Sequence, residues 1–329
     1  MKDSMKISFN EFIKLKKHKG NPISEQSIKI YNSQFNSLLK SFKTDKPNFV
    51  NNSERVLQIL KTEFSNVNTM KLKVNIVLMV LECFFRDNKN YDMNNKIYND
   101  YLTKLITIIK DNNESHIPSE TQVNKALDKQ ENDLIITTLK KNVKHSIQDN
   151  EDLEHLKQYI IYLFYEYHPI RADLATSKFM LNKDIHKMND KINNVVLDKE
   201  NKEVYYYQVD YKTKKKYGEN KIKITNELYK YIVKLFNYYN NKLKIKDKYF
   251  LYQKDNITPF NTNNLSKFYS NIGLLVLNKP ISLQINRIQQ ASEDSEEIDR
   301  LEEKSKQQNH SMTIHTTTYY KRGLKSKKQ

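Results

Sequence analysis

The spacing of apolar residues in the first part of the chain restricts that part to an all-helical unit. From Ser24 to Phe42, apolar side chains recur every three or four residues and share one helix face: Ile28, Tyr31, Phe35, Leu38 and Leu39. Similar stripes predict helices from about Ser53, from Thr69 to Arg86 and from Asn94 to Ile109. We therefore predict a compact four-helix domain over residues 1–110, in which the first 20 residues are a basic lead without a helix of their own.

The second part of the chain begins after a stretch that loses this periodicity and contains Pro118, so residues 111–130 are predicted to be a linker. Helical spacing resumes at about Glu131. Three strand-like stretches follow, at Asn194–Leu197, Val204–Tyr211 and Ile222–Ile224, and the basic turn between the last two suits a hairpin. The pattern predicts a mainly α chain with one small antiparallel β-sheet (α+β), in which residues 131–329 form a second domain.

The charge balance points to a polyanionic partner. The sequence holds 56 Lys and Arg against 39 Asp and Glu, a net charge of +17 at pH 7. Basic proteins with such an excess commonly bind nucleic acid, because each neutralised phosphate releases condensed counterions. The alternative is that Lys and Asn simply fill solvated faces in a protein from an AT-rich genome, such as that of a mobile element or a large DNA virus. Six of the basic residues are arginines.

Cysteine content and hydropathy exclude several classes of protein. A single cysteine, Cys83, rules out an internal disulfide framework and a zinc site built on cysteines. The N-terminus lacks the apolar stretch of a signal peptide, and no run of apolar residues has the length needed to span a bilayer. We therefore expect an intracellular protein that is neither secreted nor bound to a membrane.

Two of the scarce arginines lie in segments that carry other chemically useful groups. Arg171 follows a proline turn, His168-Pro169, at the end of a predicted helix, where a rigid element can aim it into a cleft. Arg287 comes three residues after Gln284. His310 follows Arg287 by 23 residues, and Tyr319 follows His310 by nine.

This set resembles the signature of the tyrosine recombinase, or phage-type integrase, family. That signature combines an arginine in a turn before a helix, a lysine in a β-hairpin and the motif His-x-x-Arg, then a histidine and, nine residues later, a tyrosine. The matching residues here are Arg171, Lys212 at the hairpin end, Gln284 with Arg287, His310 and Tyr319. The resemblance extends from about Ser24 to Tyr319, because the N-terminal helices resemble the core-binding domain of the family.

The chain departs from the family pattern at three positions. Gln284 stands where many members have histidine, which puts proton transfer at that position in question and leaves hydrogen bonding to phosphate. Asp173 lies two residues after Arg171, whereas the acidic residue of the family usually lies three after. Asn309 precedes His310 where glycine is frequent. Both arginines and the tyrosine remain.

The resemblance implies an enzyme that cleaves and rejoins double-stranded DNA through a covalent 3′-phosphotyrosine. Tyr319 would be the nucleophile, and Arg171, Arg287 and His310 would stabilise the negative charge on the phosphorane. Lys212 would protonate the leaving 5′-oxygen, although Lys214, Lys215 and Lys216 are close enough in sequence to compete for this role. No metal, ATP or organic cofactor is implied, and the expected assembly is a homotetramer on paired DNA sites.

Two other functions remain compatible with these residues. A DNA-relaxing enzyme of the type IB topoisomerase kind would use nearly the same groups as a monomer. A relative that has lost catalysis would bind DNA without cutting it, and Gln284 would then mark the decay of the site. The DNA target, and the choice between integration, excision and resolution, are not encoded in any motif that we recognise.

Overall fold

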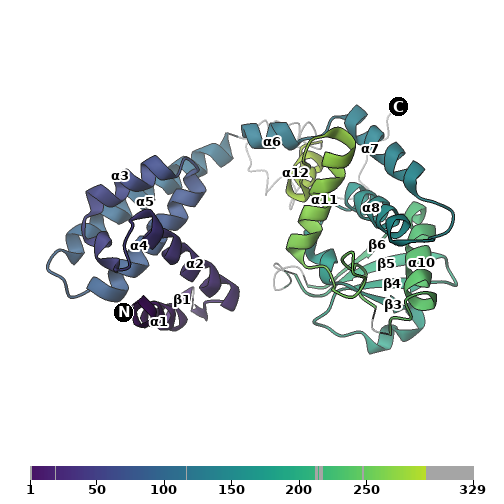
Figure 1. Cartoon of the computed structure of the whole chain (residues 1–329), viewed down its shortest axis with the longest axis horizontal. Helices are drawn as coiled ribbons and strands as arrows, with labels where there is room; N and C mark the ends of the chain where they lie inside the picture. Colours follow the sequence, from purple (N-terminus) through teal and green to yellow (C-terminus); the bar gives the residue numbers. More distant parts are fainter. Residues whose placement is uncertain are drawn as a thin grey trace, which may run out of the picture. The chain divides into compact units, whose positions relative to one another are not determined.

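The computed structural model describes residues 2–18, 20–115, 117–211, 214, 218–246 and 248–293. The chain divides into two compact units, Met1–Pro118 and a second unit that begins at Ser119 (Figure 1). The first unit is helical apart from one short pair of strands. The second is mainly helical and contains a four-stranded sheet. The predicted α+β class is therefore confirmed at this level.

The first unit contains one helix that the sequence pattern did not predict. Its elements are α1 (Lys2–Leu15), β1 (Lys17–His18), β2 (Asn21–Pro22), α2 (Glu25–Ser41), η1 (Pro47–Asn51), α3 (Ser53–Glu63), α4 (Val67–Phe85) and α5 (Tyr91–Glu114). The expected basic lead is thus wrong, since α1 occupies it. Phe9 and Ile13, one helical turn apart, are fully buried, and the Phe9 ring lies 4.5 Å from that of Phe35. Among the side chains of this basic stretch that the structure describes, these two buried residues are too few to produce a visible stripe.

Helix α4 is the central element of the first unit. It contacts α1, α2, α3 and α5, and its side chains Val74, Ile76 and Val77 are fully buried. Polar side chains fix where the neighbouring helices begin. Ser24 accepts a hydrogen bond from the backbone N–H of Ser27 at the start of α2, and Asn52 accepts one from that of Arg55 at the start of α3. Each cap satisfies a backbone N–H that has no partner within its own helix.

The second unit alternates helices with the strands of the sheet. Its elements are α6 (Glu120–Lys125), α7 (Lys129–Asn142), α8 (Asn150–Tyr167), η2 (Ala172–Thr176), β3 (Lys178–Leu181), η3 (Asn182–Lys187), β4 (Asn194–Asp198), β5 (Glu203–Gln208), β6 (Asn220–Lys223), α10 (Asn226–Asn241), α11 (Thr262–Leu277) and α12 (Leu283–Glu293). Residues 111–130 therefore include the last turn of α5, all of α6 and the first residues of α7.

The sheet is mixed, which corrects the predicted antiparallel sheet. Its strand order is β3-β4-β5-β6, and β4–β5 and β5–β6 pair antiparallel as expected. Strand β3 adds to the edge in parallel with β4, with Phe179 opposite Val195. Four residues are too short for alternation to be recognised in the sequence, so this strand was missed. A parallel partner also needs a crossover connection, which η3 provides here.

Helix α8 forms the centre of the second unit and determines where the candidate site lies. Tyr159, Tyr162 and Tyr165 are fully buried, and the helix contacts α7, α10, α11 and α12. Because it is buried over most of its length, the turn that follows its C-terminus is held by packing on several sides. Among the described residues, no helix combines the length and apolar character needed to cross a membrane.

Candidate active site

Arg171 lies in the turn that follows α8. The helix ends at Tyr167, and Pro169 prevents its continuation because proline lacks a backbone N–H and restricts the residue before it. Arg171 is half-buried and immediately precedes the short helix η2. The buried Tyr165 hydroxyl donates to the Arg171 carbonyl oxygen at 3.1 Å. This bond ties the arginine backbone to the core of the unit.

Arg287 approaches the same turn from helix α12. Its Nε donates to the carbonyl oxygen of Pro169 at 3.0 Å, although 118 residues separate the two positions in the sequence. Pro169 is two residues before Arg171. The structure therefore brings the segments of both predicted arginines together, and the Arg287 side chain is oriented by a main-chain acceptor.

Asp173 provides a negative charge near both arginines. Its carboxylate is half-buried and accepts a hydrogen bond from Gln208 Nε2 at 3.2 Å. Burial raises the pKa of Asp173, and the bond from Gln208 and the positive charges of Arg171 and Arg287 act in the opposite direction. The Arg171, Asp173, Gln208 and Arg287 side chains, which we call the arginine site, thus form one electrostatic group drawn from η2, β5 and α12.

The end of strand β5 is fixed beside the arginine site. The buried Asn193 side chain accepts hydrogen bonds from the backbone N–H groups of Val209 and Asp210, both at 2.8 Å, and donates to the Asp210 carbonyl at 2.9 Å. The hairpin that carries the predicted lysine therefore leaves the sheet from an anchored point. Lys214, one of the competing lysines, donates from Nζ to the Asp190 carbonyl at 3.1 Å.

Of the remaining predicted site residues, the structure describes Gln284 and leaves the others outside its described ranges. Gln284 is exposed in the first turn of α12, three residues before Arg287, so it is available to a ligand and is not part of the buried packing. Lys212, His310 and Tyr319 lie outside the described residues, as do Lys215 and Lys216. Their placement in the site remains a prediction.

Two amide side chains on α12 were not anticipated from the sequence. Asn286 Nδ2 donates to the Tyr165 carbonyl at 2.9 Å, and Gln290 Nε2 donates to the Glu166 carbonyl at 2.8 Å. The last carbonyls of a helix lack intrahelical partners, so this amide pair satisfies groups that α8 leaves open. Asn286 and Gln290 lie four residues apart, which places them on one helix face, and this spacing is the only signal that the sequence offered.

Comparisons with protein-family models, with curated proteins and with solved structures found no match to this chain. The argument for function therefore depends on the residues and their geometry.

Proposed function

We propose that this chain is a site-specific DNA recombinase or integrase that cleaves and rejoins DNA through a covalent 3′-phosphotyrosine. In this reaction the Tyr319 hydroxyl releases its proton to solvent, and its oxygen forms a bond to the phosphorus of a backbone phosphodiester. The bond from phosphorus to the 5′-oxygen breaks, and Lys212 protonates that oxygen. Rejoining reverses these steps with a 5′-hydroxyl from the partner strand.

The observation that carries the proposal is the bond from Arg287 Nε to the Pro169 carbonyl, which holds the second arginine beside the turn that carries Arg171. A phosphorane carries more negative charge than the phosphodiester from which it forms. Guanidinium groups match phosphate oxygens in geometry and do not lose their proton, so two of them held in place favour the transition state. The positive charges of both arginines act on the Asp173 carboxylate. The backbone bonds to Tyr165 and Pro169 support a pre-organised arrangement.

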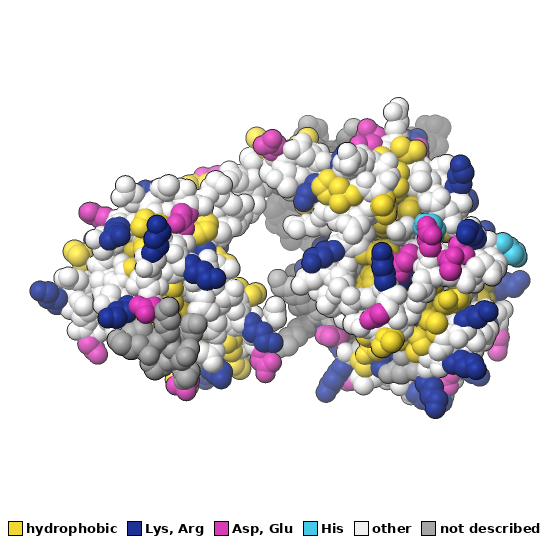
Figure 2. All heavy atoms as spheres, in the orientation of Figure 1, with side chains coloured by type: hydrophobic (Ala, Val, Ile, Leu, Met, Phe, Trp, Pro, Cys, Tyr) yellow, Lys and Arg dark blue, Asp and Glu magenta, His cyan; other side chains and the backbone are white. Residues whose placement is uncertain are grey.

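The other residues take their roles from the family pattern. His310 joins the arginines in binding the non-bridging oxygens, and Gln284, which is exposed, donates a hydrogen bond to phosphate. The partners are double-stranded DNA and further copies of the chain, since exchange between two duplexes needs four cleavages. Figure 2 shows Lys and Arg side chains scattered over the visible face of each unit. Asp and Glu side chains lie among them, so the support for contacts to DNA backbone comes from the net charge of +17. The protein would act inside the cell, in the cytoplasm or nucleus of a host if it is viral.

A suicide substrate tests the proposal. Duplex DNA with a nick close to the cleavage site loses a short fragment after attack, which traps the protein on the DNA. Because the target sequence is unknown, a pooled library of nicked duplexes is used and adducts are resolved on a denaturing gel. We expect an adduct in the presence of EDTA, its loss in Tyr319→Phe and its retention in the matched control Tyr320→Phe.

The same assay distinguishes the alternatives. Adducts together with relaxation of plasmid DNA, but without recombinant product, would favour the topoisomerase-like function. DNA binding without any adduct would favour a relative that has lost catalysis. An adduct that persists in Tyr319→Phe would remove this tyrosine from the mechanism.

A further inference from the structure

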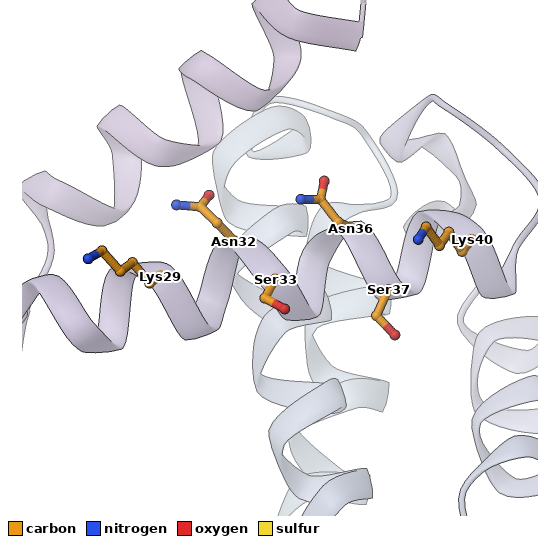
Figure 3. Close-up of a pocket in the computed structure, with 6 residues that line it drawn as sticks. All are labelled: Lys29, Asn32, Ser33, Asn36, Ser37 and Lys40. Atoms are coloured by element: carbon orange, nitrogen blue, oxygen red, sulfur yellow. The ribbon is translucent and has the colours of Figure 1, made fainter. Parts of the chain in front are cut away.

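A polar pocket of about 580 Å³ lies along helix α2 in the first unit. The described residues of its lining all lie on this helix: Lys29, Asn32, Ser33, Asn36, Ser37 and Lys40. Figure 3 shows the two lysines toward opposite ends of this row, with the amide and hydroxyl side chains between them. Among the lining residues that the structure describes, there are two cations and no carboxylate. The charge of the pocket is therefore complementary to an anion.

A buried lysine lies behind this pocket. Lys73 of α4 is 2% exposed, and its Nζ donates to Ser37 Oγ at 2.7 Å. The same ammonium lies 4.9 Å from the centre of the Phe64 ring. Burial lowers the pKa of Lys73, against the opposing charge of Glu63. Within the described part of the chain, no carboxylate forms an ion pair with Lys73, which is unusual because buried charges are normally paired.

The bond from Lys73 determines how the Ser37 hydroxyl is used. An ammonium group only donates hydrogen bonds, so Ser37 Oγ must accept, and its own proton must point to a different acceptor. No such acceptor for Ser37 occurs among the residues that the structure describes. Because Ser37 lines the pocket, an anion there would receive a hydrogen bond from a hydroxyl that is itself polarised by a buried cation.

We propose that this pocket binds one backbone phosphate of duplex DNA. The Ser37 hydroxyl donates to a non-bridging oxygen, and Lys73 supplies positive charge behind it. Lys40, one helical turn from Ser37 on the same face, adds a second positive charge. The choice of DNA as the source of the phosphate rests on the proposed function. Lys73 thus contributes charge to DNA binding although its side chain is buried.

The test uses the full-length chain with Tyr319→Phe, so that binding is measured without cleavage. Lys73→Met retains the volume of the side chain and removes its charge. We expect this variant to bind labelled duplex DNA about tenfold more weakly, and the slope of log affinity against log salt to fall by about 0.9, the value for one phosphate contact. The melting temperature should be at least that of the parent, since replacing a buried charge by an apolar group of similar size is commonly neutral or stabilising.

Three further variants make the result specific. Ser37→Ala should weaken binding by about three- to tenfold, because it removes a charge-assisted hydrogen bond, and Ser37→Thr should restore it by returning the hydroxyl. Lys104→Met is the matched control, because Lys104 is exposed on α5 and does not line the pocket. We expect the DNA affinity of Lys104→Met to change by less than about twofold, because an exposed lysine away from the pocket makes at most a peripheral contact.

The outcomes separate this inference from the proposed function. If Lys73→Met and Ser37→Ala bind DNA with the affinity and salt slope of the parent, the pocket is not a phosphate site. Adduct formation by the unmodified chain would leave the recombinase proposal intact in that case. If the unmodified chain neither binds DNA nor forms adducts, both proposals fail.

Discussion

At the scale of single residues, the two arginines of the site differ in how they are held. Arg171 is positioned through its backbone, whose carbonyl accepts from the buried Tyr165 hydroxyl. Arg287 is positioned through its side chain, by the bond from Nε to the Pro169 carbonyl. That bond occupies one of the five donor groups of the guanidinium and leaves the others for phosphate. A lysine at either position would keep the charge and lose the planar donor arrangement.

We therefore expect Arg171→Lys and Arg287→Lys to slow adduct formation by at least about 10²-fold, the usual cost of losing one pre-organised donor to a developing charge. DNA affinity should change little, since the charge is retained. The rate is measured in single-turnover experiments on the nicked substrate. Arg55→Lys in α3 serves as the matched control and should react at the rate of the unmodified chain. Lysine variants at the site that cleave equally fast would contradict the proposed role of the arginines.

His168, the residue before Pro169, predicts a pH dependence of stability. Its ring packs 5.4 Å from that of Phe164, and its buried Nε2 has no hydrogen-bond partner among the described residues. Burial lowers the pKa of His168. A histidine whose folded pKa lies below its unfolded value stabilises the fold above about pH 6.5, and this contribution is lost as the pH falls through the folded pKa.

We expect the free energy of unfolding of the second unit to decrease between pH 7 and pH 5, as measured by urea denaturation. In His168→Phe this part of the decrease should disappear, because the group that must take up a proton is gone. His186→Gln is the control, since His186 is exposed on η3. An unchanged pH dependence in His168→Phe would show that the histidine is not responsible.

At the scale of elements, α12 is attached to the end of α8 by side chains that bond to main-chain carbonyls. The amide pair Asn286 and Gln290 satisfies the Tyr165 and Glu166 carbonyls, and Arg287 satisfies that of Pro169. Two donors from α12 thus satisfy the last carbonyls of α8, and a third binds the turn that follows it. The arrangement fixes the rotation of α12 about its own axis, and with it the direction of Arg287.

Removing Asn286, one member of the amide pair, should therefore affect both stability and catalysis. Asn286→Ala leaves the buried Tyr165 carbonyl with a weaker partner and should destabilise the second unit by about 1–3 kcal/mol. We expect the adduct rate to fall at saturating DNA, with DNA affinity nearly unchanged, because orientation of Arg287 is lost and its charge is not. Both are measured by thermal unfolding and single-turnover kinetics. Ser292→Ala, on the exposed side of the same helix, should change neither, and an equal effect there would point to general loosening of α12.

The sequence predicted those elements whose burial leaves a regular spacing. Helix α2 and the β5–β6 hairpin were recognised because Phe35, Leu38, Val204 and Tyr206 repeat at helical or strand intervals. Helix α1 and strand β3 were missed because too few buried residues mark them. At the site, the two arginines were found through a resemblance to a family pattern.

The residues that orient the arginines could not be found in this way. Asn286, Gln290 and Asn193 bond to backbone groups that are distant in sequence or unmarked by residue type. Every residue carries the same main-chain carbonyl, so a single sequence does not indicate which carbonyl a side chain will bond to. The role of Tyr165 was also not predicted, because it is one of 22 tyrosines in the chain and nothing in the sequence distinguishes it from the others.

At the scale of the whole molecule, each of the two units has its own buried core. The core of the first includes Phe35, Val74 and Leu81, and that of the second includes Leu156, Ile160 and Leu235. Residues 117–119, which lie between α5 and α6, have no regular structure, and Ile117 is 75% exposed. A protease needs an exposed, extensible segment, so limited digestion should cut here before it cuts within the described helices and strands of either unit.

The division into units leads to a prediction about DNA binding. If the first unit binds phosphate through the α2 pocket and the second through the arginine site, the covalent connection makes the second contact intramolecular. We expect the full-length chain to bind duplex DNA at least about 10²-fold more tightly than either fragment, Met1–Pro118 or Ser119–Gln329, measured by anisotropy at one salt concentration. Thermal unfolding of each fragment is the control for folding. If one fragment binds DNA as tightly as the full chain, a single unit carries the DNA interface. The hypothesis that both units contact DNA would then be wrong.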